Sequence, residues 1–314
     1  MKQLQVLVLM DPLSSIHPEQ DTTFALALAG QEAGHQMHYA QVGDLQLRGA
    51  TPFVHCRQIW FQRDACCYRW DSPGQECSLE EFDLVLLRKD PPFDEDYFFA
   101  THFLELARRP LILNHPRALR DAPEKLFPLR FPQVIPPTLI SRKAGEIKAF
   151  LQEQGAIILK PLNRCGGAGV IYLEAGDRNF NSLIELSTGD FTRHIVAQRY
   201  LPEIRQGDKR VIVLQGQAVG GLLRTPQPEE HRGNIHVGGQ VSLSPLTPRE
   251  QWLVEQVGPA LVAMGLYFVG LDIIGGYITE INVTSPTGIQ EIHRLGGIDI
   301  APLFWQRLPW KAAP

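Results

Sequence analysis

The chain has 314 residues, of which 44% are hydrophobic and 20% are charged, and its formal net charge is −4. This length suits one large domain or two to three smaller ones with a substantial core. A slightly acidic chain without a basic block is not a dedicated nucleic-acid binder, and no apolar run approaches the roughly 18 residues of a membrane span. We therefore expect no nucleic-acid partner and no membrane.

The first 120 residues alternate predicted strands with predicted helices. We expect strands at 4–10, 36–42, 82–88 and 111–114, and helices at 22–34 and 97–109. Asp21 is a suitable N-cap for the first helix and Gly34 a suitable stop. The alternation predicts an α/β domain with a parallel sheet, whose ligand-facing edge lies at the carboxyl ends of the strands. The polar residues expected at that edge are Arg88, Lys89, Asp90 and Asn114.

The five cysteines are odd in number and contain no C-x-x-C pair. Such a pattern favours free thiols in a reducing cytoplasm over disulfides or a zinc site. The first apolar stretch is too short for a signal peptide, lacks an A-x-A-like cleavage site and ends at Asp11-Pro12, so we interpret it as a first β-strand.

The second half changes character. Strands are predicted at 156–162 and 194–202, a hairpin at 209–224 that turns near Gln215-Gly216, and a helix at 248–265. Residues 225–240 are polar and rich in proline and glycine. A connection of this length is more often functional than structureless, so we predict a mobile lid loop, with a floppy surface loop as the alternative.

The stretch GLDIIGGYITEINVTSPTG, residues 270–288, predicts a hairpin that carries acids on buried strands. A three-residue loop at 275–277 would pair Ile274 with Ile278 and Asp272 with Glu280. It would also gather the apolar side chains on one face and place Asp272, Glu280 and Asn282 on the other. A two-residue loop would mix the faces, so we predict the three-residue loop.

Two carboxylates and an amide on one face suit a cation. Like charges a few ångströms apart repel unless a cation or proton lies between them. Oxygen ligands favour Mg²⁺, with Mn²⁺ as an alternative, and the lack of nearby His or Cys disfavours Zn²⁺. A solvated polar sheet face is the structural alternative.

The segment LKPLNRCGGAG suggests a phosphate site. Lys160 ends a predicted strand and is followed by Gly166, Gly167 and Gly169. A lysine near flexible backbone N–H groups suits phosphate, although the lysine precedes the glycines and the segment is therefore not a P-loop. A purely structural turn is the alternative.

Several strings occur together in a recognisable order: RKDPPFD, NHPRALRDAPEKL, LKPL, AQRYLP, GDKRV, RGN, GLDIIG and TEINVTSPTG. In this order and spacing the chain resembles bacterial glutathione synthetase, of the ATP-grasp superfamily, from about residue 9 to 293. The resemblance implies an N-terminal α/β (pre-ATP-grasp) domain at 1–122. It further implies two α+β ATP-grasp subdomains at 123–202 and 203–314, the second with the lid 225–240 and the metal site.

The resemblance also implies site residues. For ATP these are Lys125, Lys160, Gly166, Gly167, Gln198, Arg199, Tyr200, Leu201, Asp208 and Arg210. The metal ligands would be Asp272, Glu280 and Asn282, as the hairpin argument also predicts. Arg210, Arg224 and Arg232 would face the transferring phosphate or the acyl intermediate. The peptide substrates would meet Arg88, Asn282, Ser285, Thr287 and Glu291.

The implied reaction is the ATP-dependent ligation of γ-glutamylcysteine and glycine to glutathione through an acyl phosphate, with release of ADP and phosphate. The implied assembly is a homo-oligomer, a tetramer or a dimer. The alternatives are another ATP-grasp peptide or amino-acid ligase, and a non-catalytic nucleotide-binding regulator. Arg164 and Cys165 depart from the family's glycine loop, and so does His236 at the end of the lid. The metal and lysine positions are intact, so we do not infer a loss of catalysis from these departures.

Overall fold

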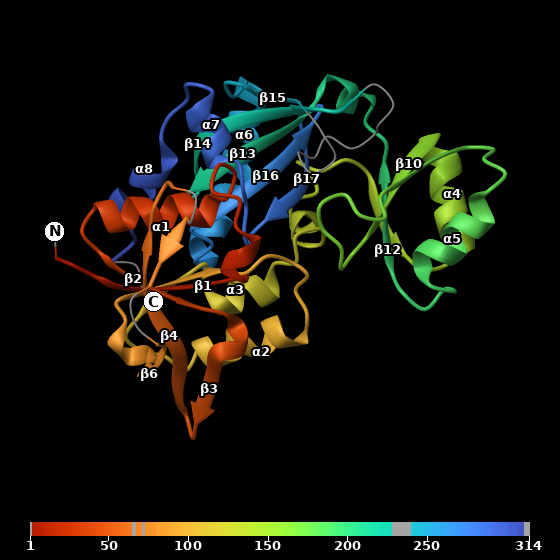
Figure 1. Cartoon of the computed structure of the whole chain (residues 1–314). Helices are drawn as coiled ribbons and strands as arrows, with labels where there is room; N and C mark the ends of the chain where they lie inside the picture. Colours follow the sequence, from red (N-terminus) through yellow and green to blue (C-terminus); the bar gives the residue numbers. More distant parts are fainter. Residues whose placement is uncertain (1, 65–66, 71–72, 228–239, 311–314) are drawn as a thin grey trace.

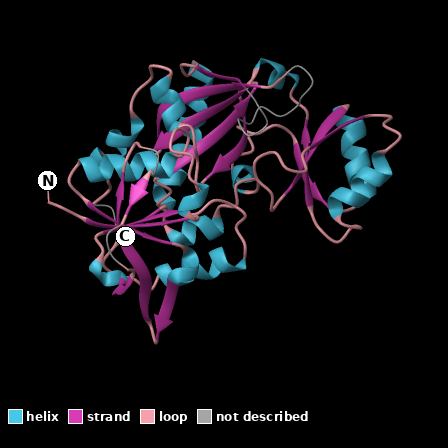
Figure 2. Ribbon diagram, in the orientation of Figure 1, coloured by secondary structure: helices cyan, strands magenta, loops and turns pink. Residues whose placement is uncertain are grey.

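The structure is a computed structural model that describes residues 2–64, 67–70, 73–227 and 240–310 (Figure 1). It contains three sheets with helices packed on them (Figure 2). The predicted α/β fold class is confirmed. In the described part of the chain, no helix is long and apolar enough to cross a membrane.

The first sheet has the strand order β3-β4-β2-β1-β7-β8. Its parallel part consists of β1 (Gln5–Met10), β2 (Gln36–Ala40), β7 (Leu84–Arg88) and β8 (Leu111–Leu113). The helices α1 (Thr22–Glu32), α2 (Glu95–Leu104) and α3 (Pro116–Asp121) connect or follow these strands. Asp21 caps α1 as predicted, because its Oδ1 accepts a hydrogen bond from the Phe24 backbone N at 2.7 Å.

An antiparallel extension of this sheet was not predicted. It consists of β3 (Leu45–Arg48), β4 (Thr51–Phe61), β5 (Tyr68–Arg69) and β6 (Gln75–Ser78). Buried and more exposed residues alternate along much of β4, which is the pattern of a strand with one solvated face. The sequence shows this alternation too. Polar residues separate the apolar ones, however, and for this reason no strand was predicted there.

The second sheet, in the order β11-β10-β12-β9, is antiparallel. Its strands are β9 (Thr138–Ser141), β10 (Ala156–Pro161), β11 (Ile171–Glu174) and β12 (Ile195–Arg199). The helices α4 (Ala144–Gln154) and α5 (Phe180–Thr188) pack on one side of it (Figure 1). This part has a hydrophobic core of its own, which includes Ile147, Leu159, Ile184 and Ile195.

The third sheet, in the order β15-β14-β13-β16-β17, is also antiparallel. Its strands are β13 (Asp208–Leu214), β14 (Gln217–Thr225), β15 (Gln240–Leu243), β16 (Phe268–Ile274) and β17 (Tyr277–Asn282). The hairpin turn at Gln215-Gly216 is confirmed. The helices of this part are α6 (Pro248–Met264), α7 (Ile289–Arg294) and α8 (Ile300–Gln306).

The first and third sheets share their hydrophobic cores. One cluster joins Leu87 of β7 to Leu271 of β16, and another joins Val8 of β1 to Phe268 of β16. Burial of apolar surface is the main favourable contribution to folding, so these two parts form one body. Figure 1 shows the 138–199 sheet set apart from that body and connected to it by extended segments. The exact domain boundaries stay a prediction.

Candidate active site

The hairpin of β16 and β17 carries the predicted acids. Asp272 pairs with Glu280, as predicted, and Gly270 pairs with Asn282. The predicted loop is wrong: Ile274 pairs with Tyr277 across a two-residue turn at Gly275-Gly276, not with Ile278. A β-bulge restores the register, because β17 contributes one extra residue between the pairs Ile273–Ile278 and Asp272–Glu280.

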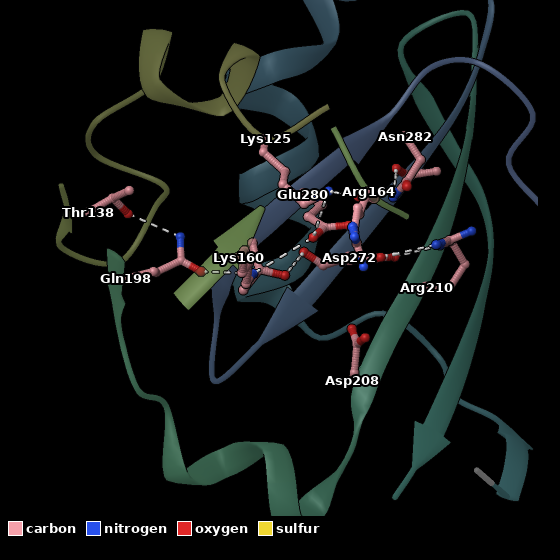
Figure 3. Close-up of polar contacts among 12 residues, drawn as sticks. Lys125, Thr138, Lys160, Arg164, Gln198, Asp208, Arg210, Asp272, Glu280 and Asn282 are labelled. Carbon is pink, nitrogen blue, oxygen red and sulfur yellow. Dashed lines mark hydrogen bonds and ion pairs between the residues drawn. The ribbon is translucent and has the colours of Figure 1, made fainter. Parts of the chain in front are cut away.

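The two faces of the hairpin separate as expected. Val269, Leu271, Ile273, Ile281 and Val283 are buried in one hydrophobic cluster. Glu280 lies on the other side between two lysines, with its Oε1 3.8 Å from Lys160 Nζ and 4.0 Å from Lys125 Nζ (Figure 3). Asn282 Nδ2 donates to the Gly270 carbonyl at 3.2 Å, and no described residue donates a hydrogen bond to the Asn282 amide oxygen.

Asp272 is held by arginines. Its Oδ1 and Oδ2 lie 2.5 and 3.0 Å from Arg210 Nε and Nη2, and Oδ1 also lies 3.0 Å from Arg224 Nη2. Burial favours the neutral acid, but Arg210 and Arg224 outweigh it and keep the pKa of Asp272 below its usual range. Asp272 is therefore an anion in a positively charged setting.

Asp208 completes this charge cluster. One carboxylate oxygen of Asp208 accepts a hydrogen bond from Arg224 Nη2. The other, Oδ1, is buried without a hydrogen-bond partner among the described residues, as is Arg224 Nε. Buried polar atoms are normally paired, so these two atoms indicate a missing polar ligand.

A first pocket opens between the second and third sheets. Lys160 lies 9% exposed at its floor, where its Nζ donates to Gln198 Oε1 at 3.1 Å. Gln198 Nε2 in turn donates to Thr138 Oγ1 at 3.0 Å. The predicted nucleotide residues that line this pocket are Lys125, Lys160, Gly166, Gly167, Gln198, Arg199, Tyr200, Leu201 and Asp208.

The glycine loop after β10 bends over this pocket. Gly166, Gly167 and Gly169 have φ of 66°, 78° and 74°, a region that favours glycine. Lys125 Nζ donates to the Arg164 carbonyl, which links the loop to the 123–126 segment. The residues that departed from the family pattern, Arg164 and Cys165, both line the first pocket.

A second pocket lies on the other side of the acids. Its lining includes the predicted residues Arg210, Arg224, Asn282, Ser285 and Thr287. Four residues line both pockets, namely Cys165, Gly166, Asp272 and Glu280. The two pockets therefore meet at the carboxylate pair of the hairpin.

Two of the predicted site residues that the structure describes lie elsewhere. Arg88 and Glu291 are buried and line neither of these two pockets. Arg88 Nε donates to Thr23 Oγ1 at 3.1 Å, and its Nη2 donates to the Pro286 carbonyl at 2.9 Å. Arg232 and the predicted lid segment around it, including His236, lie outside the described residues.

Asn114 is not a ligand-facing residue, contrary to the prediction for that sheet edge. Its Oδ1 accepts from the backbone N of Tyr267 and of Phe268, at 2.8 and 2.9 Å. Its Nδ2 donates to the Phe268 and Val283 carbonyls at 2.8 and 2.6 Å. The amide is fully used in fastening β8 to β16 and the end of β17, because the third sheet covers this edge.

Two residues of the site were missed. Thr138 orients Gln198, and Glu124 lines the second pocket. Glu124 precedes Lys125 in the string RDAPEKL, and a carboxylate next to a proposed phosphate lysine was a usable signal. Thr138 offered none, because its strand is short and starts just after two prolines.

The residues of the hairpin fit a divalent cation. The two lysines lie beyond hydrogen-bond distance of the Glu280 carboxylate, and the Asn282 amide oxygen is not used in the hydrogen bond to Gly270. Both side chains can therefore bind a cation without rearrangement. Asp272 would bind the cation either while it keeps its hydrogen bonds to the arginines or after it gives them up. No cluster of three or more His, Cys, Asp or Glu that could hold a metal occurs in the described ranges, and this site has two carboxylates and one amide.

Family models match nearly the whole chain. The prokaryotic glutathione synthetase N-terminal domain matches residues 4–120, and the ATP-grasp domain of the same family matches residues 124–297. The glutathione synthetase of Bradyrhizobium diazoefficiens is 43% identical over 320 residues, covering 99% of both chains. That of Brucella melitensis is 44% identical and covers 96% of this chain and 97% of its own.

Solved structures agree on the fold at low sequence identity. The D-cycloserine synthetase DcsG is 13% identical with a TM-score of 0.68, covering 96% of this chain and 97% of its own. The ATP-grasp ligase PsnB is 17% identical with a TM-score of 0.62, covering 98% and 97%. These likenesses confirm the ATP-grasp fold, and the family models with the close relatives confirm the resemblance found in the sequence. The chain therefore belongs to the prokaryotic glutathione synthetase family and is an ATP-grasp enzyme of glutathione synthesis.

Proposed function

We propose that the chain joins γ-glutamylcysteine to glycine through an acyl phosphate, using ATP in the first pocket and the peptide substrates in the second. The observation that carries this mechanism is the meeting of the two pockets at Asp272 and Glu280. A phosphoryl donor on one side and a carboxylate acceptor on the other would face each other there. Positioning and charge neutralisation are the main catalytic effects in such a transfer.

The first pocket supplies groups for a nucleoside triphosphate. Lys125 and Lys160 carry positive charge at the acid junction, and the glycine loop offers backbone N–H groups for phosphate oxygens. Gly166 and Gly167 are the loop residues proposed for this role. Residues 198–201 form the end of β12 and its continuation, where main-chain groups and the Tyr200 ring can hold the adenine. Asp208 would face the ribose or the phosphates, and Arg210, which lines the second pocket, would reach the phosphates from beside Asp272.

We further propose that Asp272, Glu280 and Asn282 hold Mg²⁺, with Mn²⁺ as a substitute. When bound, the metal would neutralise phosphate charge. The unpaired Asp208 Oδ1 and Arg224 Nε support a polar ligand at this place. Arg210 and Arg224 would then offset charge on the transferring phosphoryl group and the acyl phosphate, with Arg232 from the predicted lid.

The second pocket would hold the peptide substrates. Ser285 and Thr287 line it, together with Asn282. Arg88 fixes the carbonyl of Pro286, which lies between Ser285 and Thr287, so it would act on this loop from behind. Glu291 lies buried in the first turn of α7 and completes the proposed set. We also propose a cytoplasmic homo-oligomer, a tetramer or a dimer.

The test is phosphate release from Mg·ATP with γ-glutamylcysteine, measured with and without glycine, together with the mass of the product. Glycine-dependent release with a glycine-extended tripeptide is the expected result. Release with a different acid or amine only would point to another ATP-grasp ligase. ATP binding without any release would point to a regulator and would overturn the mechanism.

A further inference from the structure

The consecutive residues Glu124 and Lys125 point to opposite sides of the active site. Lys125 lines the first pocket, and Glu124 lines the second. The Glu124 carbonyl accepts a hydrogen bond from the Ile281 backbone N at 3.1 Å, which fastens this segment to β17 between the proposed metal ligands. The placement of Glu124 relative to the acid junction is therefore set by the hairpin itself.

The carboxylate of Glu124 differs from the other carboxylates at the junction. Asp208 and Asp272 form ion pairs with arginines, and Glu280 lies between two lysines. For Glu124 the described residues provide no ion pair within 4 Å, only a hydrogen bond from Thr284 Oγ1 to its Oε1 at 2.9 Å. The Thr284 hydrogen bond therefore fixes one oxygen of the Glu124 carboxylate. The other oxygen can accept a hydrogen bond from a cationic group.

The second half of the proposed reaction needs such a group. The amine of glycine is an ammonium ion near neutral pH, and it must lose a proton before its lone pair can attack an acyl carbon. The arginines of the second pocket, Arg210 and Arg224, do not accept protons. His17, Asp21 and Asp90 also line this pocket, but of these groups and Glu124 only Glu124 is hydrogen-bonded to β17 beside the proposed metal ligands. Asp272 is engaged by both arginines, and Glu280 belongs to the proposed metal site.

We propose that the Glu124 carboxylate binds the ammonium group of glycine and accepts the proton that the nitrogen must lose before it attacks the acyl phosphate. This inference rests on the function proposed above. The new C–N bond forms as the acyl C–O bond to phosphate breaks, with the electron pair leaving on the phosphate oxygen. Of the two protons that the nitrogen gives up, one goes to Glu124 and one leaves with the phosphate. Glu124 then passes its proton to solvent.

The test compares glycine with hydroxylamine, an amine that is already neutral at pH 7. In Glu124→Gln we expect kcat/KM for glycine to fall by about 10²–10⁴, the range of a general base. Hydroxamate formation from γ-glutamylcysteine, Mg·ATP and hydroxylamine should stay within about threefold of the unchanged enzyme. Glu124→Asp should recover part of the activity with glycine.

Two control variants test whether the loss of any carboxylate lowers the rate. Glu153→Gln and Glu185→Gln each change an exposed carboxylate outside both pockets, and neither should reproduce the glycine defect. An unchanged kcat/KM for glycine in Glu124→Gln, or an equal loss with hydroxylamine, would overturn the role of Glu124. If the unchanged enzyme formed no hydroxamate, the acyl phosphate itself would be wrong, and the inference would fail with it.

Discussion

Glu280 is the residue on which the proposed phosphoryl transfer depends most. Its carboxylate lies opposite Asp272 and within 4.0 Å of two lysine ammonium groups. In Glu280→Gln the neutral amide holds a cation less tightly and leaves the lysine charge uncompensated. We expect kcat to fall by about 10²–10³, the usual effect of removing one electrostatic group from a transition state.

The measurement is steady-state phosphate release, with circular dichroism and Tm to check the fold. Glu280 is only partly buried, so we expect little change in Tm. The matched control is Glu153→Gln on the exposed face of α4, which should leave kcat unchanged. A near-normal kcat in Glu280→Gln would remove the metal assignment.

Asp208 should make the free energy of unfolding depend on pH. Burial raises the pKa of Asp208 from 3.8 to about 6, although Arg224 opposes the shift. The native carboxyl thus holds its proton more tightly than the unfolded chain does. Its contribution to the free energy of unfolding is full below about pH 4 and is lost as the pH rises through about 6.

We therefore expect Asp208→Asn to flatten the change in unfolding free energy between pH 4 and 6. The measurement is urea denaturation of the ligand-free enzyme at several pH values, compared with the unchanged chain. Parallel pH curves for the two proteins would show that Asp208 is not the titrating group.

At the scale of elements, the hairpin of β16 and β17 shows what side-chain alternation predicts and what it leaves open. Alternation predicted the pair of Asp272 and Glu280, because only one pairing segregates polar from apolar side chains. It did not reveal whether the extra residue lies in the turn or in a bulge. Both solutions give the same pairing at the acids, so this feature is decided by local backbone geometry.

The approach of α6 to the β13–β14 turn predicts a stability effect. A Cβ on Gly258 would clash with the Gly216 carbonyl, and one on Gly216 would lie 2.8 Å from the Gly258 carbonyl. In Gly258→Ala the clash should cost about 1–3 kcal/mol and outweigh the roughly 1 kcal/mol of better helix propensity. Urea denaturation measures the net destabilisation.

Gly145 in α4 is the matched control for this substitution. Apart from its chain neighbours and the backbone of its own helix, nothing lies within 4 Å of a Cβ built there, so Gly145→Ala should stabilise the chain by up to about 1 kcal/mol. A stabilising Gly258→Ala would mean that α6 shifts away from the turn without cost.

For the whole molecule, the separate core of the 138–199 sheet predicts independent local opening. Ile184 is fully buried in that core, and truncating such a side chain costs about 2–5 kcal/mol. In Ile184→Ala we expect faster amide hydrogen exchange in residues 138–199, with little change in 4–122 and 208–308. Nucleotide affinity should fall, because β10 and β12 form one wall of the first pocket.

Val257→Ala in α6 is the comparison for this experiment. Val257 lies in a cluster that also contains residues of β1 and β7, so exchange should rise in both parts of the shared body. A uniform rise throughout the chain in Ile184→Ala would show that the three sheets unfold as one unit.

The sequence by itself determined the α/β class, the main strands and helices of the parallel sheet, the acid pair of the hairpin and the family. These features rest on local periodicity and on short strings of fixed spacing, which do not depend on distant contacts. Only the tertiary structure decided that Asn114 fastens two sheets, that arginines hold Asp272, and that Glu124 faces the second pocket. The physical reason is that each of these depends on which backbone or side chain from a distant segment packs beside it.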